Sequence, residues 1–311
     1  MKIVFFGTPD FAVPSLERLA DDPELRVEAV VSQPDRAAGR HASLAAPPVA
    51  RFARERGIPL LQPAGIRGDE FVSAVRELAP DVLVVVAYGR ILPPALLAVP
   101  VLGAVNVHGS LLPRHRGASP VQAAILAGDA VTGVATMRMT EGLDEGPVFA
   151  TRETAIEPDD TAQTLAARLA ALGAGLLVET LRGLARGALV PRPQQGEPTY
   201  CRPIRREDGR IDWARPAGEI LRMLRAYAPW PGVFTSLDGE TVKILEAEPG
   251  PPGLPGSPGA MVPTGGGFAI VCADSSSVVP RRLQRSGRRP AEGGDFFRGL
   301  RAGSREIRFG P

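Results

Sequence analysis

The sequence predicts an α/β protein, with a Rossmann-like open sheet in its first part and a small OB-like β-barrel in its last part. Three observations support this fold class. Short apolar runs alternate with helical patterns in the first half, the strongest run is apolar on both faces, and short strand patterns recur after residue 206. A chain of 311 residues has room for two such domains.

The first elements alternate regularly between strand and helix. Residues 3–6 are β-forming and apolar and end at a turn, and residues 11–20 follow with helical spacing. We expect further strands at 27–31, 81–87 and 104–107, and helices at 49–56, 71–78 and 121–126. The run DVLVVVA at 81–87 is typical of the centre of a parallel sheet. The alternation favours an open sheet with right-handed crossovers.

The second half of the chain begins with two nearly adjacent strands and a long helix. The pattern predicts strands at 134–139 and 148–156 and a helix at 161–184, which closes a first domain spanning 1–188. Residues 189–206 lack periodicity and are expected to be a linker. The domain at 207–311 is expected to hold a helix and short strands, which favour a small barrel. These lie at 217–226 (helix) and at 233–237, 241–247, 261–262 and 268–272 (strands).

Charge is distributed unevenly along the chain. The net charge is +2, but the part from Cys201 onward carries +5, and residues 276–311 contain nine Arg and three acidic residues. A basic C-terminal region suits a polyanionic partner such as nucleic acid. Arg outnumbers Lys 34 to 2, as GC-rich coding would also give, so the charge alone leaves both explanations open.

Several classes of protein are not indicated. The two cysteines, Cys201 and Cys272, are far apart, and no cluster has the spacing of metal ligands, so we expect neither a disulfide framework nor a metal site. The N-terminal apolar run is too short for a signal peptide, and no apolar stretch approaches 18 residues. No glycine-rich phosphate loop occurs. We therefore expect a cytoplasmic protein with no membrane segment.

The segment NVHGSLLP at 106–113 is the most informative part of the sequence. Asn106 and His108 are two residues apart near the end of a predicted strand, so their side chains should point to the same side. Sites in open α/β sheets gather at the carboxyl ends of the strands. An amide and an imidazole there could bind a developing oxyanion and transfer a proton, although a core histidine is the common alternative. His41 and His115, in Arg-flanked turns, are expected to be solvated.

Asp144 is the candidate partner for this histidine. It lies between glycines in the segment EGLDEGP at 141–147, after a predicted strand. A carboxylate there could orient His108 and stabilise its charged form. A surface turn would have the same composition, because Asp and Gly favour turns.

The segment NVHGSLLPRHRGASP at 106–120 resembles the signature of enzymes that use 10-formyltetrahydrofolate as a formyl donor. Within that superfamily the chain is most similar to the methionyl-tRNA formyltransferases. The motifs FGTPDFAVP at 6–14, QPDR at 33–36, VAYGRIL at 86–92 and EGLD at 141–144 carry this resemblance, as do EDGRIDW at 207–213 and PWPG at 229–232. The resemblance covers nearly the whole chain and fades after about residue 273.

The resemblance implies an activity, two substrates and a set of residues. The chain would transfer the formyl group of 10-formyltetrahydrofolate to the α-amino group of initiator methionyl-tRNA, as a monomer and without a metal. Asn106, His108 and Asp144 match the catalytic residues of the family. The folate-contacting positions match Ser110, Leu111, Leu112 and Pro113, with Tyr88 and Gly89 beside them, and the tRNA-contacting loop at 36–47 contains Arg36 and Arg40.

This sequence departs from the family pattern at a few positions. His41, Ala42 and Ser43 replace basic residues that usually follow the loop arginine, Gly109 replaces an alanine, and Pro203 stands where lysine is common. A sugar-nucleotide formyltransferase, a formyltetrahydrofolate hydrolase and a non-catalytic tRNA- or folate-binding protein are the alternatives. The motifs after residue 200 argue against the first. The second would leave the extra basic domain without a purpose, and the joint presence of the three catalytic matches argues against the third.

Overall fold

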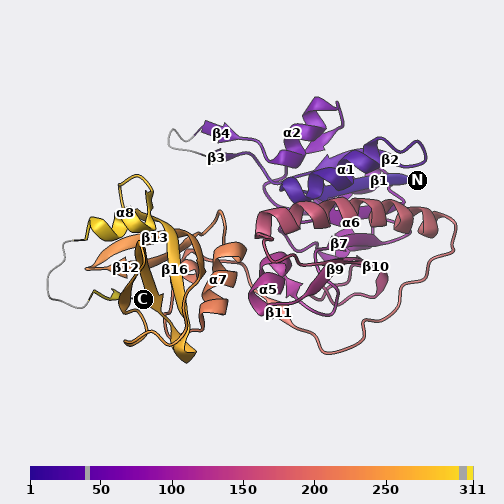
Figure 1. Ribbon diagram of the computed structural model, residues 1–311. Coiled ribbons are helices and arrows are strands. Elements are labelled where there is room, and N and C mark those ends of the chain that lie inside the picture. The colour runs from indigo at the N-terminus through magenta and orange to yellow at the C-terminus, as the bar shows by residue number, and fades with distance from the viewer. Residues whose placement is uncertain (39–42, 301–306, 311) are drawn as a thin grey trace. The chain divides into compact units, whose positions relative to one another are not determined.

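The computed structural model describes residues 1–38, 43–300 and 307–310, and its internal contacts divide the chain into two compact units (Figure 1). The first unit comprises Met1–Pro120, Ala130–Ile156 and Leu165–Arg202, and the second comprises Val121–Asp129, Glu157–Thr164 and Pro203–Pro311. Most of the expected linker thus contacts the first unit. The predicted division into a catalytic domain at 1–188, a linker at 189–206 and a tRNA-binding domain at 207–311 stays a prediction.

The first unit is built on a seven-stranded sheet in the order β10-β9-β7-β6-β1-β2-β5. Its strands are β1 (Lys2–Gly7), β2 (Arg26–Val31), β5 (Leu60–Leu61), β6 (Val82–Val86), β7 (Ala104–His108), β9 (Val131–Arg138) and β10 (Val148–Ala155). The strands from β5 to β7 in this order are parallel, and β9 and β10 are antiparallel additions beside β7. The predicted Rossmann-like open sheet is confirmed.

Helices cover both faces of this sheet, because its central strands are apolar on both faces. On one face, Phe5 and its neighbours share a core with Leu16 of α1 and Leu177 of α6. On the other face, Phe6 shares a core with Val72 of α3. The helices of the first face are α1 (Val13–Ala20), α2 (Pro48–Glu55) and α6 (Ala162–Ala185), and those of the second are α3 (Asp69–Glu77) and α4 (Pro94–Leu97).

Helix α6 is long and apolar enough to span a membrane, by length and composition alone. Half of its most apolar stretch is buried inside the protein, and Leu177, Leu181 and Leu184 belong to the core beneath it. Its hydrophobicity is therefore accounted for by packing on the sheet (Figure 1).

Short elements complete the first unit. A 3-10 turn, η1 (Asp10–Ala12), precedes α1, so the helix expected at 11–20 is interrupted at its start. The strands β3 (Arg36–Ala38) and β4 (Ser43–Ala45) form a small antiparallel hairpin. The strands β8 (Arg116–Gly117) and β11 (Tyr200–Cys201) pair in parallel, which places the expected linker against the segment that follows β7.

The second unit is a curled antiparallel sheet in the order β14-β15-β16-β13-β12-β18, with β17 beside β16. A bridge between Ala260 and Arg308 joins the two ends of this order, which closes the small barrel that the sequence predicts. Its core includes the stacked rings of Phe268 and Phe309, 5.9 Å apart, and Trp213, whose indole N–H donates to Thr235. The strands are β12 (Val233–Leu237), β13 (Glu240–Pro249), β14 (Met261–Thr264), β15 (Gly267–Val271), β16 (Ser277–Arg285), β17 (Ala291–Glu292) and β18 (Phe309–Gly310).

Helices pack around this barrel unit. Helix α7 has the predicted bounds, and its Arg222 and Arg225 donate to the backbone carbonyls of Leu126 and Asp160. Strand β16, paired with β13 over most of its length, was missed by the sequence analysis because three arginines and a proline obscure its alternation. The helical segments are α5 (Pro120–Ala127), η2 (Arg206–Gly209), α7 (Ala217–Ala226), η3 (Ala273–Ser275) and α8 (Gly293–Arg298).

Candidate active site

Asn106 and His108 lie at the carboxyl end of β7, where the parallel part of the sheet meets its antiparallel part. Asn106 pairs with Val85 of β6 on one side and with Met137 of β9 on the other. Both side chains are nearly buried, at 8 % and 6 % exposed. Since Val105 and Val107 enter the core with α6, strand alternation places Asn106 and His108 on the opposite face. The shared orientation predicted from the spacing follows from this register.

Both ring nitrogens of His108 face an oxygen atom. The Nε2 atom lies 2.9 Å from the carbonyl oxygen of His115, and a carbonyl can only accept, so Nε2 carries a proton. The Nδ1 atom lies 3.7 Å from Oδ2 of Asp144, with both side chains largely buried. This second distance is too long for a hydrogen bond and suits an ion pair when the ring is protonated. The imidazole of His108 therefore lies between a backbone carbonyl and a carboxylate.

Asp144 is held in the loop between β9 and β10. Its backbone has φ of +52°, a left-handed conformation that Asp tolerates better than most residues. Its Oδ2 atom accepts a 2.8 Å hydrogen bond from the backbone N–H of Gly117. One carboxylate oxygen thus contacts both the histidine of β7 and the loop that follows it. The sequence did not reveal that Gly117 belongs to this site.

The loop that contains His115 is fixed by the segment that was expected to be a linker. The backbone N–H of His115 donates to Thr199 Oγ1 at 2.8 Å, and the N–H of Ala118 donates to the carbonyl of Cys201 at 3.1 Å. Between them, Gly117 has φ of +113°, and a Cβ there would lie 2.2 Å from the Cys201 carbonyl oxygen. Only glycine allows this approach.

His115 is a correction to the sequence analysis, which expected it to be solvated. Its side chain is only 7 % exposed, because the pairing of β8 with β11 covers the turn in which it lies. The sequence signal, arginines on both sides, was misleading. Its carbonyl is the group that holds His108.

Cys201 adjoins the same loop. Its thiol lies 3.3 Å from the carbonyl oxygen of Arg116 and accepts from the backbone N–H of Ser119 at 3.4 Å. Burial, with a smaller contribution from the nearby Asp144 carboxylate, raises the pKa of the Cys201 thiol. The neutral thiol is thereby favoured, so this cysteine is a packing group and a poor nucleophile.

The segment Ser110–Pro113 continues directly from β7. The Ser110 hydroxyl donates to the carbonyl of Arg114 at 2.5 Å, and Pro113 is buried after a cis peptide bond. Leu111 packs so closely on β9 that a Cβ on Gly133 would lie 2.6 Å from its Cδ2 atom. Leu111 and Leu112 are half-buried. The segment therefore has a fixed shape beside Asn106 and His108.

Tyr88 and Gly89 follow the end of the neighbouring strand β6. The Tyr88 ring is 1 % exposed and packs edge-on against Phe6, and burial raises the pKa of its phenol. Its backbone carbonyl accepts hydrogen bonds from Thr8 Oγ1 and Gln33 Nε2. Gly89 has φ of +80°. A ligand at this strand end would meet the backbone of these two residues, because the tyrosine ring points into the core.

Comparisons with known proteins identify the family. The formyl transferase family model matches residues 1–181, and the model of the formyl transferase C-terminal domain matches residues 203–301. A methionyl-tRNA formyltransferase of Anaeromyxobacter dehalogenans is 50 % identical over 306 residues, or 97 % of each chain. The same enzyme of Myxococcus xanthus is 47 % identical over 300 residues, or 96 % of this chain and 95 % of that one. The chain belongs to the methionyl-tRNA formyltransferase family.

Solved structures of more distant proteins share the fold of this formyltransferase. An N-formyltransferase of Helicobacter canadensis, solved with folinic acid and dTDP-3-aminofucose, has a TM-score of 0.64 at 17 % identity, over 92 % of this chain and 99 % of that one. HypX of Aquifex aeolicus, solved with tetrahydrofolic acid, has a TM-score of 0.61 at 18 % identity, over 99 % of this chain and 50 % of that one. At these identities the likeness shows the fold alone.

Of the two arginines predicted to contact tRNA, Arg36 belongs to the described part of this formyltransferase. Arg36 begins β3, and its guanidinium donates to Gln33 Oε1 at 2.9 Å. Because Gln33 also donates to the Tyr88 carbonyl, the base of the hairpin is tied to the end of β6. Arg40, like His41 and Ala42, lies outside the described residues.

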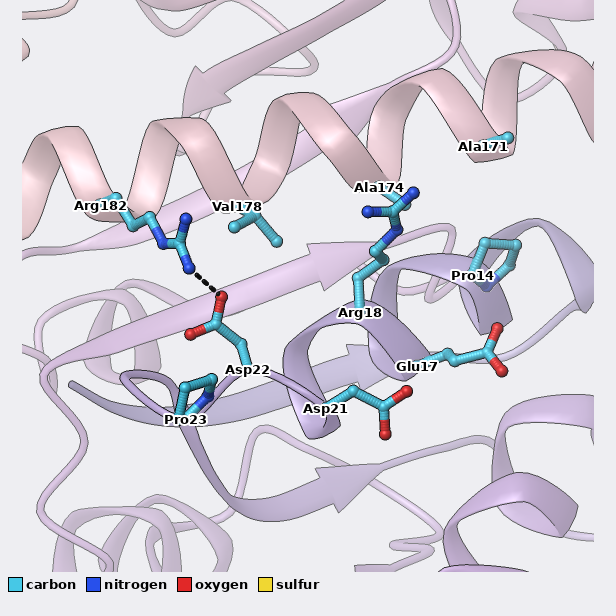
Figure 2. Close-up of a pocket in the computed structure, with 10 residues that line it drawn as sticks. All are labelled: Pro14, Glu17, Arg18, Asp21, Asp22, Pro23, Ala171, Ala174, Val178 and Arg182. Atoms are coloured by element: carbon cyan, nitrogen blue, oxygen red, sulfur yellow. Dashed lines mark hydrogen bonds and ion pairs between the residues drawn. The ribbon is translucent and has the colours of Figure 1, made fainter.

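A cavity of about 680 Å³ lies between α1 and α6 of the formyltransferase (Figure 2). Alanines and a valine of α6 line one side, and the Asp22 carboxylate and the Arg182 guanidinium form an ion pair of 2.8 Å at its edge. No residue predicted for the site lines it. Within the described residues, no three His, Cys, Asp or Glu side chains are placed to hold a metal ion.

Proposed function

We propose that this formyltransferase moves the formyl group of 10-formyltetrahydrofolate to the α-amino group of initiator methionyl-tRNA, as a monomer in the cytoplasm. The observation that carries the proposal is the convergence of Asn106, His108 and Asp144 at the end of β7. An identity near 50 % over both units, to enzymes named for methionyl-tRNA, supports the acceptor. The folates named for two proteins of the same fold support the donor.

The folate is expected to bind along the segment that follows β7. Ser110, Leu111, Leu112 and Pro113 would line it, with the half-buried leucines as the apolar contacts. The Ser110 hydroxyl already donates to Arg114, so the polar contacts of this segment would come from its backbone. On the other side, the backbone of Tyr88 and Gly89 would approach the ligand. A folate bound in this way would have its N10 near Asn106 and His108.

The reaction is a direct acyl transfer. The uncharged α-amine attacks the formyl carbon, a tetrahedral oxyanion forms, the bond from carbon to N10 breaks, and the proton lost by the amine ends on N10. The Asn106 amide would donate a hydrogen bond to the oxyanion. One such donor typically lowers the activation barrier by on the order of 3 kcal/mol. Protonated His108 would add a donor when its Nε2–H leaves the His115 carbonyl for the substrate.

Asp144 would support both stages of the reaction. Its carboxylate, 3.7 Å from Nδ1, stabilises the imidazolium while the oxyanion exists. The imidazolium can give its proton to N10 as the bond to the formyl carbon breaks, and the neutral ring can then take up the proton that the amine loses, directly or through water. Binding both substrates in one site supplies the remaining acceleration as effective molarity. No covalent enzyme intermediate is required.

The tRNA would be bound mainly through its phosphates. The domain at 207–311 carries nine arginines in its last 36 residues, and phosphate contacts of this kind position a nucleic acid and weaken with salt. The hairpin loop, with Arg36 and Arg40, is the expected contact of the first domain with the acceptor end. The missing basic residues after Arg40 predict that this loop relies on few ionic contacts.

The assay is formylation of charged initiator methionyl-tRNA, with elongator methionyl-tRNA in parallel. We expect formyl-methionine from the initiator alone, and an affinity for tRNA that falls steeply between low and physiological salt. Formylation of both tRNAs would support the proposed reaction but refute the selectivity for initiator tRNA. Release of free formate, formylation of a sugar nucleotide instead, or a salt-independent affinity would each contradict the proposal.

A further inference from the structure

Gln194, in the segment between α6 and the second unit, uses its whole amide group within the candidate site. Its Nε2 donates to the backbone carbonyls of Asp144 and Gly146, each at 2.8 Å. Its Oε1 accepts from Nε and Nη2 of Arg116, at 3.1 and 2.8 Å. One side chain therefore binds both segments that meet at the Asp144 carboxylate.

The loop that carries Asp144 needs such a contact. Residues 139–147 form no helix or strand between β9 and β10, and Asp144 itself has a left-handed backbone. At the base of the loop, the backbone N–H of Arg138 donates to the carbonyl of Pro147. Gly146 lies so close to the Arg138 carbonyl that a Cβ on this residue would not fit. Closer to the tip, Gln194 binds the Asp144 and Gly146 carbonyls with a single NH₂ group.

Arg116 provides the fixed end of this connection. Its guanidinium donates to the Tyr200 hydroxyl at 3.0 Å, lies 5.7 Å from the centre of that ring, and approaches Glu145 at 3.7 Å. The next residue, Gly117, donates its backbone N–H to the Asp144 carboxylate. Gln194 thus sets the distance between the backbone of the Asp144 loop and the loop that receives its carboxylate.

We propose that Gln194 is a positioning residue that holds Asp144 opposite His108. This inference deepens the proposed function and, for its kinetic consequence, rests on it. Gln194 does not touch the reacting groups. It acts through Asp144, because the carbonyl that it binds belongs to the residue whose carboxylate faces the imidazole.

The sharpest perturbation is Gln194→Glu. A glutamate keeps an acceptor for Arg116, loses both N–H donors, and turns a carboxylate oxygen toward two carbonyl oxygens. The matched control is Gln195→Glu, which makes the same change of charge one position later on an exposed side chain. We expect Gln194→Glu to lower kcat by at least about tenfold, as the loss of two partly buried hydrogen bonds allows, with KM for both substrates nearly unchanged. The control should resemble the wild type.

A double-mutant cycle separates positioning from general damage. In an Asp144→Asn background, Gln194→Glu should cost little more, because the carboxylate that it positions is already gone. An equal loss in both backgrounds would overturn the inference, as would equal activities of the two Gln→Glu variants in the wild-type background.

A second measurement needs no activity. The backbone N–H of Gly117 donates to Asp144, whereas the flanking N–H groups of Arg116 and Ala118 donate to carbonyls of Thr199 and Cys201. In amide hydrogen exchange followed by NMR, Gln194→Glu should accelerate exchange at Gly117 and leave its two neighbours protected. Unchanged exchange at Gly117, or acceleration at all three, would overturn the inference. If the wild type fails to formylate methionyl-tRNA, the proposed function falls, while this exchange result still decides the role of Gln194.

Discussion

Replacing Asp144 by Asn isolates the electrostatic part of the proposed mechanism. In the wild type, the backbone N–H of Gly117 donates a 2.8 Å hydrogen bond to the Asp144 carboxylate. Asparagine retains an oxygen that can accept this hydrogen bond, so the loop should keep its conformation. The negative charge 3.7 Å from Nδ1 of His108 is lost. At that distance two unit charges interact by about 1 kcal/mol in water and about 4 kcal/mol at an effective dielectric constant of about 20. Because the pair is largely buried, the larger value is the better guide.

The expected consequence is a loss of turnover. If the imidazolium is present in the transition state, Asp144→Asn should lower kcat by roughly a hundredfold to a thousandfold. The assay is single-turnover formylation at saturating folate and methionyl-tRNA, with Asp69→Asn, an exposed carboxylate on α3, as the control. Urea unfolding should show a free energy of unfolding within about 1 kcal/mol of the wild type. Turnover within twofold of the wild type would refute the assignment of Asp144 to the reaction.

Three further perturbations test separate parts of the structure. Asn106→Ala should lower single-turnover formylation by about a hundredfold, as for the loss of one oxyanion donor, and a near-normal rate would remove it from the mechanism. Gly117→Ala should lower the free energy of unfolding in urea by about 1–3 kcal/mol or more, since its Cβ would lie 2.2 Å from the Cys201 carbonyl; an unchanged value would contradict that close approach. Burial raises the pKa of Cys272 from 9.0 to about 12, which disfavours the thiolate in the folded state. This contribution to stability is present below about pH 9 and lost as pH rises toward 12. Between roughly pH 8 and pH 10.5, the free energy of unfolding should therefore fall less in Cys272→Ala than in the wild type; an equal fall in both proteins would contradict this prediction.

The open sheet could be predicted because its signal is local. The apolar runs of β1, β2, β6 and β7 are bounded by turn residues, and each was placed to within about two residues by composition and period. The end of β7 could be recognised as a candidate site for the same reason. Two polar residues at the period of a strand, just before a turn, are evident in the sequence without any partner.

The second unit was harder to predict. Helix α7 and the strands β12, β13 and β15 alternate clearly enough to be found, but β16 reads as a basic stretch because its arginines and Pro280 interrupt the pattern. In the barrel, a strand that pairs on both sides can carry charged residues on its outer face. Tertiary pairing therefore overrides the local composition.

The sequence by itself determined the alternation of strands and helices, the presence of Asn106 and His108 on one strand, and the family signature that follows them. Only the tertiary structure decided which distant residues complete the site. The contacts of Asp144 with Gly117, of His115 with Thr199, and of Gln194 with both loops join segments 27 to 84 residues apart. Such contacts leave no periodic pattern, because they depend on how loops are brought together by the sheet rather than on the order of neighbouring residues.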